Sequence, residues 1–182
     1  YEIPDFFDEA GMSDVLKNFE ATSENDCAFQ TRLIYASLFT RRANNPHQNY
    51  PEREADEPYP ILNPSEFREE ARTIGRILIE RAVRDRQHAT WVDLVSDPLI
   101  ERYIPRPSGF DLYSGLSGVA LFFSALYRTF GEGVYKEYAL AAIQPIREKL
   151  QSSTRRSLIS KMGIGGGNGA ASIVYAFVKM AD

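Results

Sequence analysis

Two glycine clusters are the residues of this chain whose type and spacing could bind a ligand. Gly115 and Gly118 stand three residues apart at the start of an apolar stretch, and residues 163–169 (Gly-Ile-Gly-Gly-Gly-Asn-Gly) precede a second one. Glycines three apart share one face of a helix's first turn, where the missing Cβ lets another backbone or a substrate approach. The clusters therefore predict either a ligand-facing loop or tight packing of helix ends, and the sequence leaves both open.

Nucleotide binding is a poor match for the second cluster. Residues 165–170 satisfy a loose dinucleotide-binding pattern of glycines with alanine in the last place. However, no strand–helix–strand pattern surrounds them, and no Gly-Lys-Ser/Thr sequence of a phosphate loop follows. We therefore expect no nucleotide site here.

The other residues that could do chemistry do not combine into a site. Cys27, His47 and His88 lie in three unrelated contexts, whereas a zinc site needs three or four converging ligands. Ser114 and Ser117 have no recognisable histidine partner, and the Gly-x-Ser-x-Gly motif of serine hydrolases is absent. The sequence thus predicts no catalytic residue, no metal ligand and no bound cofactor within the chain.

Helices must position both glycine clusters. Apolar periodicity and capping residues predict a mainly α fold, with helices over residues 8–20, 24–42, 64–86, 116–130, 134–151 and 169–181. Gly131 is expected to end the fourth of these, and Pro145 to kink or restart the fifth. Residues 91–95 and 102–104 are rich in β-formers and predict one small β-hairpin between helices.

A proline-rich, acidic segment divides the chain. Residues 43–65 include five prolines, which remove backbone donors and fix φ, so we predict a linker between residues 1–42 and residues 66–182. Two helices with one apolar face each cannot build a core of useful size. Residues 1–42 are therefore expected to pack on something outside the chain.

Composition and charge restrict the class of protein. The 182 residues are 43% hydrophobic and 25% charged, which is typical of globular domains. The net charge of −4 makes nucleic-acid binding unexpected. The single cysteine allows no internal disulfide, no apolar run approaches the ~20 residues of a transmembrane segment, and the first residues have no signal-peptide pattern. We expect a cytoplasmic protein.

Buried and half-exposed helices are expected to alternate after the hairpin. Residues 116–127 carry no charge and residues 170–178 are again apolar, whereas the helix between them is charged. This alternation is typical of a double ring of helices, so we expect the two apolar helices to lie side by side and parallel in one core. The first should be buried on nearly all sides and, in an unfinished ring, should leave Leu121, Phe122 and Phe123 without partners.

Several stretches occur in the order found in one known family. These are residues 3–7 (Ile-Pro-Asp-Phe-Phe) with 30–37, residues 67–94 with Ala-Thr-Trp-Val at 89–92, residues 111–122, and residues 166–169 with 172–177. In this order they resemble the end of the dehydratase domain, the entry into the cyclase domain and the first two Gly-x-x-Gly helices of the LanC-like cyclase in class II lanthipeptide synthetases (LanM type). Ser114 departs from the pattern, because the family usually has an acidic residue there.

This resemblance implies a fold and an activity. The first helices of an α/α toroid, with a small β-hairpin insertion, would follow the terminal helices of a kinase-like dehydratase domain. Such synthetases dehydrate Ser and Thr of a precursor peptide (leader plus core) and add Cys thiols to the products, forming the (methyl)lanthionine rings of lantibiotic biosynthesis. Zinc, held by two Cys and one His, serves the cyclase, and ATP with Mg serves the dehydratase.

The resemblance also implies partners and site residues. Zinc and ATP/Mg belong to the full-length parent, so this segment alone is expected to be inactive, with the precursor peptide and the rest of the synthetase chain as its partners. Seven residues are expected to line the cyclase cavity: Asp111, Tyr113, Gly115, Gly118, Gly166, Asn168 and Gly169. The alternative is a self-contained helical module that binds a peptide in a groove without catalysis.

Overall fold

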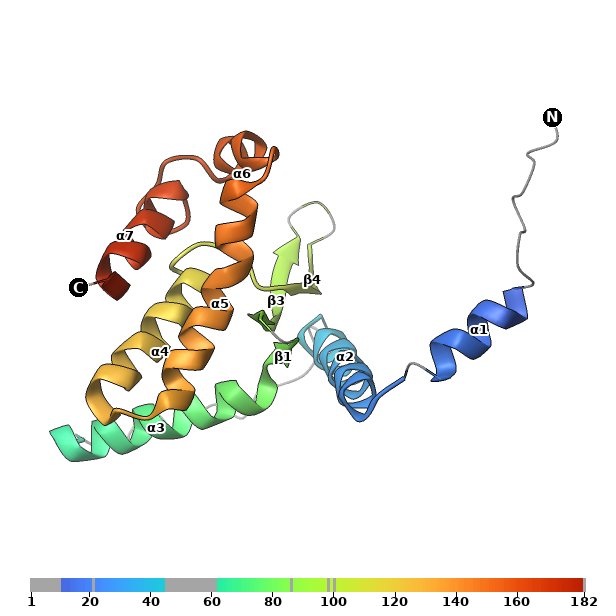
Figure 1. The fold of residues 1–182 in the computed structure, drawn as a ribbon, viewed down its shortest axis with the longest axis horizontal. Helices are drawn as coiled ribbons and strands as arrows, with labels where there is room; N and C mark the ends of the chain where they lie inside the picture. The colour runs from blue at the N-terminus through green and yellow to red at the C-terminus, as the bar shows by residue number, and fades with distance from the viewer. Residues whose placement is uncertain are drawn as a thin grey trace.

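The computed structural model describes residues 11–20, 22–44, 62–85, 87–97, 99 and 101–181. The described part of the chain is mainly α-helical, as predicted, and it also contains two small antiparallel strand pairs (Figure 1). Its elements are α1 (Gly11–Glu20), α2 (Glu24–Ala43), α3 (Pro64–Arg81), β1 (Val83–Arg84), β2 (Ala89–Thr90), β3 (Val92–Asp97), β4 (Arg102–Pro107), α4 (Leu116–Phe130), α5 (Gly133–Gln151), α6 (Arg155–Met162) and α7 (Ala170–Ala181). His47 and most of the predicted linker lie outside the described residues.

Helix α3 begins where predicted and ends earlier. The Asn63 side chain accepts from the backbone N–H groups of Ser65 and Glu66, and the Glu66 carboxylate accepts from the Asn63 N–H at 2.7 Å. The predicted end at residue 86 is wrong, because α3 stops at Arg81 and the backbone turns extended at Ala82. The guanidinium of Arg32 in α2 donates to the carbonyls of Glu80 and Ala82. These carbonyls at the end of α3 therefore accept hydrogen bonds from a side chain and not from a following helical turn.

The hairpin is longer than predicted, and a second strand pair was missed. β3 pairs antiparallel with β4 from Val92 opposite Pro107 to Asp97 opposite Arg102. β1 and β2 pair Val83 with Thr90 over only two residues each, which leaves no alternating pattern in the sequence to detect.

Helices α4 and α5 form an antiparallel pair joined by a short turn (Figure 1). Gly131 ends α4 in the left-handed conformation (φ 73°) and donates its N–H to the Tyr127 carbonyl at 2.8 Å, so this predicted end is confirmed. The predicted restart at Pro145 is wrong, because α5 continues through it. Pro145 removes one donor from the helix, whereas the buried neighbours Ile143 and Ile146 keep the surrounding turns packed.

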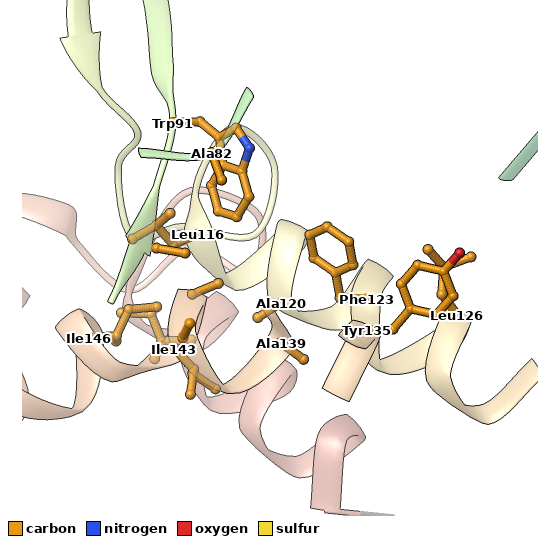
Figure 2. Close-up of a cluster of buried hydrophobic side chains, with 14 residues drawn as sticks. Ala82, Trp91, Leu116, Ala120, Phe123, Leu126, Tyr135, Ala139, Ile143 and Ile146 are labelled. Carbon is orange, nitrogen blue, oxygen red and sulfur yellow. The ribbon is translucent and has the colours of Figure 1, made fainter. Parts of the chain in front are cut away.

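Phe123 of α4 lies at the centre of the core (Figure 2). Its side chain is fully buried, and its ring centroid lies 6.2 Å from those of Trp91 and Tyr135 and 5.6 Å from that of Tyr138. The Trp91 indole donates to the Leu78 carbonyl of α3 at 2.8 Å. The expectation that Phe123 lacks partners is therefore wrong, since residues from the β2–β3 junction, α4 and α5 meet at this ring, and Trp91 ties the group to α3.

Helix α4 is buried along one face rather than on nearly all sides. Leu116, Ser117, Ala120, Phe123 and Leu126 are buried, which is the spacing of a single helical face. Leu121 and Phe122 are half-buried, and Ala125 is exposed. The uncharged sequence of α4 thus predicted more burial than its residues have in the structure.

Helix α2 lies against the hairpin and the end of α3, contrary to the expectation that it packs only on something outside the chain. The Asn44 side chain, just beyond α2, hydrogen-bonds to the backbone of Tyr103 in β4. Helix α1 lies apart from the other elements (Figure 1). Among the helices that the structure describes, none combines the length and the apolar character needed to cross a membrane.

Candidate functional site

The first glycine cluster closes a tight loop at the start of α4. The Leu116 N–H donates to the Gly109 carbonyl at 2.8 Å, which folds the loop back on the first turn of the helix. A Cβ on Gly115 would lie 2.5 Å from the Gly109 oxygen, and a Cβ on Gly118 would lie 2.2 Å from the Leu112 oxygen. Real Cβ atoms do not approach backbone this closely, so both glycines are required by packing.

The second glycine cluster forms a comparable loop at the start of α7. The Gly169 N–H donates to the Gly165 carbonyl at 2.9 Å, and a Cβ on Gly169 would lie 2.1 Å from the Gly165 nitrogen. Gly163 has φ 68°, a conformation that favours glycine, and its carbonyl accepts from the Ala170 N–H at 2.8 Å. Three of the seven predicted residues, Gly115, Gly118 and Gly169, thus have a structural requirement of their own.

The two glycine loops contact each other directly. The N–H groups of Leu112 and Tyr113 both donate to the Gly167 carbonyl, at 3.1 and 3.2 Å. The hydroxyl of buried Ser172 in α7 accepts from the Leu112 N–H at 3.2 Å and donates to the Gly169 carbonyl at 2.6 Å. These contacts fix the start of α7 to the loop that precedes α4.

The far ends of the same two helices also meet. The Arg128 guanidinium, near the end of α4, donates to the Lys179 carbonyl near the end of α7 at 2.9 Å. Helices α4 and α7 therefore run side by side in the same direction (Figure 1). The predicted parallel neighbours, residues 116–127 and 170–178, are confirmed.

The predicted cavity residues divide between surface and interior. Tyr113 is 84% exposed, and Gly166 and Asn168 are also exposed. Asp111 is half-buried and accepts the Ser114 N–H at 2.7 Å, so its carboxylate caps the turn between them. One further exposed residue of these loops was missed: Ile164, 88% exposed, whose signal was an apolar side chain between two glycines.

A groove of about 380 Å³ adjoins the first loop. Among the predicted residues it is lined by Tyr113, Gly115 and Gly118. Its other walls are mostly apolar and come from α3, the loop and α4: Ile74, Leu78, Leu112, Ser114, Val119 and Phe122. Asp111, Gly166, Asn168 and Gly169 do not line this groove. The arrangement offers an aromatic side chain at the edge of an apolar groove, with polar backbone groups of the glycine loops beside it.

Outside the glycine loops, His88 links the connection between β1 and β2 to helix α5. Its Nδ1 lies 2.9 Å from Asp85 Oδ2, and its Nε2 lies 2.9 Å from Glu148 Oε1 of α5. Hydrogen bonds to Asp85 and then to Glu148 raise the pKa of His88 above its ordinary 6.5. Backbone hydrogen bonds from Gln87 and His88 lower the pKa of Asp85 to about 2, and the His88 hydrogen bond lowers that of Glu148.

The described residues do not fit a metal or a serine nucleophile. No group of three or more His, Cys, Asp or Glu side chains among them is placed to hold an ion, and Cys27 lies exposed on α2. The Ser117 hydroxyl is buried and donates to the Phe110 carbonyl at 2.5 Å, so it is engaged in holding the loop. The described side chains therefore provide no set of zinc ligands.

Comparison with known proteins agrees with part of the resemblance. Residues 106–182 match the model of the family described as "Lanthionine synthetase C-like protein". The match takes in the end of β4, both glycine loops and helices α4 to α7. No curated protein matches the chain. This part of the chain is thus similar to lanthionine synthetase C-like proteins.

Proposed function

We propose that this chain is part of a bifunctional lanthipeptide synthetase of the LanM type, which dehydrates Ser and Thr of a precursor peptide and cyclises Cys thiols onto the products. The proposal rests on one observation above all. Two parallel apolar helices, within the matched residues 106–182, begin in glycine loops that hydrogen-bond to each other. In this proposal residues 1–42 end the dehydratase domain, residues 43–65 link it to the cyclase, and zinc and ATP/Mg are bound elsewhere in the parent protein.

The contribution of this segment is to position a peptide. Tyr113 projects from a loop whose backbone is fixed on both sides, by Asp111 and by Gly167. An exposed aromatic ring on a rigid loop provides a large contact area at low cost in conformational entropy. We propose that Tyr113 contacts the dehydrated peptide and orients it for thiol addition, in a cytoplasmic enzyme.

Replacement of Tyr113 tests this proposal. In the reading frame that encodes the chain, Tyr113→Ala should lower the rate of ring formation by about tenfold, the effect of one good aromatic contact, while dehydration continues. Mass spectrometry after thiol alkylation counts the uncyclised cysteines. Tyr113→Phe separates the contribution of the aromatic ring from that of the hydroxyl group. Leu99→Ala serves as a control because Leu99 is 92% exposed and lies in the hairpin turn.

The same assay separates the two classes of function. Unchanged ring formation in Tyr113→Ala would remove the positioning role. A protein that binds peptide but neither dehydrates nor cyclises it would instead be the helical module without catalysis.

A further inference from the structure

The two outer edges of the β3–β4 hairpin are not equivalent. The register, together with the bond from the Ser108 N–H to the Trp91 carbonyl, fixes which backbone groups face the partner strand. In β3, alternate residues from Asp93 onward bond to β4. The N–H and carbonyl groups of the others point away from it: Val92, Leu94 and Ser96.

The outer edge of β4 is closed to further pairing. At Tyr103 the Asn44 side chain accepts the backbone N–H at 2.8 Å and donates to the carbonyl at 3.0 Å, as a neighbouring strand would do. Pro105 and Pro107 are the next outward residues, and proline has no N–H to offer. Edges protected in this way do not accept another strand.

The outer edge of β3 has no such protection. Among the described residues, nothing hydrogen-bonds to the outward N–H or carbonyl groups of Val92, Leu94 and Ser96. Leu94 is 38% exposed, and Ser96 is exposed as well. An accessible strand edge with free donors and acceptors at alternate residues is the template for strand addition.

A cleft of about 550 Å³ lies beside the first half of this strand, at Val92, Asp93 and Leu94. Its apolar lining comes from α2, α3, the β2–β3 junction, β3 and α4 and includes Tyr35, Phe39, Leu78, Trp91, Leu94 and Val119. Leu78, Ser114 and Val119 line both this cleft and the groove at the first glycine loop, so the two hollows adjoin each other.

Charge at the cleft favours an acidic occupant. The charged lining residues are Arg32, Arg81 and Asp93. Arg32 donates to carbonyl groups, which carry no negative charge, and exposed Arg81 has no carboxylate partner in the described part of the chain. Two guanidinium groups against one carboxylate leave the cleft cationic.

We propose that β3 accepts an extended peptide segment as a third strand, with apolar side chains in the cleft and an acidic side chain beside Arg81. This inference rests on the proposed function, where the segment belongs to the precursor peptide and leads toward Tyr113. Main-chain hydrogen bonds to Val92, Leu94 and Ser96 supply affinity that does not depend on sequence, and the apolar and charged lining selects among peptides.

Leu94→Pro tests the strand edge directly. Leu94 lies opposite Pro105 and gives no bond to β4, so proline there removes an outward donor and leaves the ladder intact. The probe is a fluorescein-labelled peptide of alternating valine and threonine with glutamates at both ends, and binding to the full chain is measured by fluorescence anisotropy. Leu94→Pro should weaken binding by about tenfold, whereas Leu94→Ala, which keeps the N–H, should change it by less than about threefold.

Two further measurements do not depend on how Leu94→Pro folds. A probe with proline at every second residue should lose binding to the unaltered chain, and Arg81→Glu should weaken the glutamate probe while strengthening a lysine-flanked one. Equal binding of the proline-containing and proline-free probes, or no binding of the unaltered chain to either, overturns the proposal. So does concentration-dependent dimerisation through the same edge, since the occupant would then be a second copy.

The binding assay and the ring-formation assay fail independently. Peptide binding at β3 without ring formation in the parent reading frame would contradict the proposed function and leave strand addition standing. If Leu94→Pro changes neither peptide affinity nor ring formation, strand addition at β3 is contradicted and the proposed function stands.

Discussion

The two parts of the molecule on either side of residues 45–61 use apolar side chains in different ways. Residues 64–181 contain the whole buried core that the structure describes, from Ala82 to Ala176. In α1 and α2, none of the described side chains is buried. Both parts have helices with apolar residues at regular spacing, so the pattern predicts helices equally well in each, but burial depends on what lies opposite.

Helix α2 is held to the rest of the chain mainly by polar contacts. Arg32 donates to two carbonyls at the end of α3, and Asn44 pairs with Tyr103. Four large apolar residues of the same helix remain 55–61% exposed: Ile34, Tyr35, Leu38 and Phe39. The contrast shows that the residues that attach α2 to the rest of the chain differ from those that form the core.

The largest expected effect compares one phenylalanine from each part. Phe123→Ala should lower the free energy of unfolding by about 3–5 kcal/mol, because it removes a fully buried ring that packs against four other aromatic residues. Phe39→Ala, which is 59% exposed, should cost less than about 1 kcal/mol. Urea unfolding followed by circular dichroism measures both, and similar losses in the two variants would contradict the comparison.

An intermediate effect concerns how α2 is attached. Arg32→Ala should speed amide hydrogen exchange in α2 by about tenfold, since it removes charged donors from two carbonyls, while exchange in α4 and α5 stays unchanged. Arg41→Ala is the matched control, because Arg41 lies exposed near the end of the same helix. A uniform change across the whole chain would show that the two parts unfold as one unit.

The smallest expected effect depends on pH and lies within residues 64–181. The raised pKa of His88 means that its contribution to stability is full below 6.5 and is lost as pH rises through its pKa in the folded protein. The lowered pKa of Asp85 makes its contribution full above 3.8 and lost as pH falls toward 2. The difference in urea midpoint between the unaltered chain and His88→Gln should therefore be largest near about pH 5 and shrink by about pH 9. A difference that does not vary with pH would mean that the protonated ring has no part in joining the β1–β2 connection to α5.

Much of the helical framework could be predicted because its signals are local. The capping box at Asn63 and the glycine at 131 act on adjacent backbone, so the start of α3 and the end of α4 were both predicted correctly. The elements that were missed lack such signals. Helix α6 has few apolar residues and follows a Ser-Ser-Thr turn, and the carbonyls at the end of α3 bond to Arg32, which is far away in sequence.

The candidate site was predictable in composition but not in detail. The glycines identified the two loops, yet their meeting depends on the Gly167 carbonyl and on the Ser172 hydroxyl, and neither group carries a recognisable pattern. The sequence also could not separate glycines needed for close approach, such as Gly118, from the open position at Gly166. That difference arises only when the loop folds back over its own helix.

The bond between the glycine loops has a consequence for variation in this protein. Main-chain atoms and one buried hydroxyl hold the two helix starts together. The exposed side chains at positions 113, 164 and 168 are therefore not needed for this contact. Substitutions at these three positions can accumulate without shifting the backbone beneath them, which makes them suitable for a substitution library that probes the proposed peptide contact.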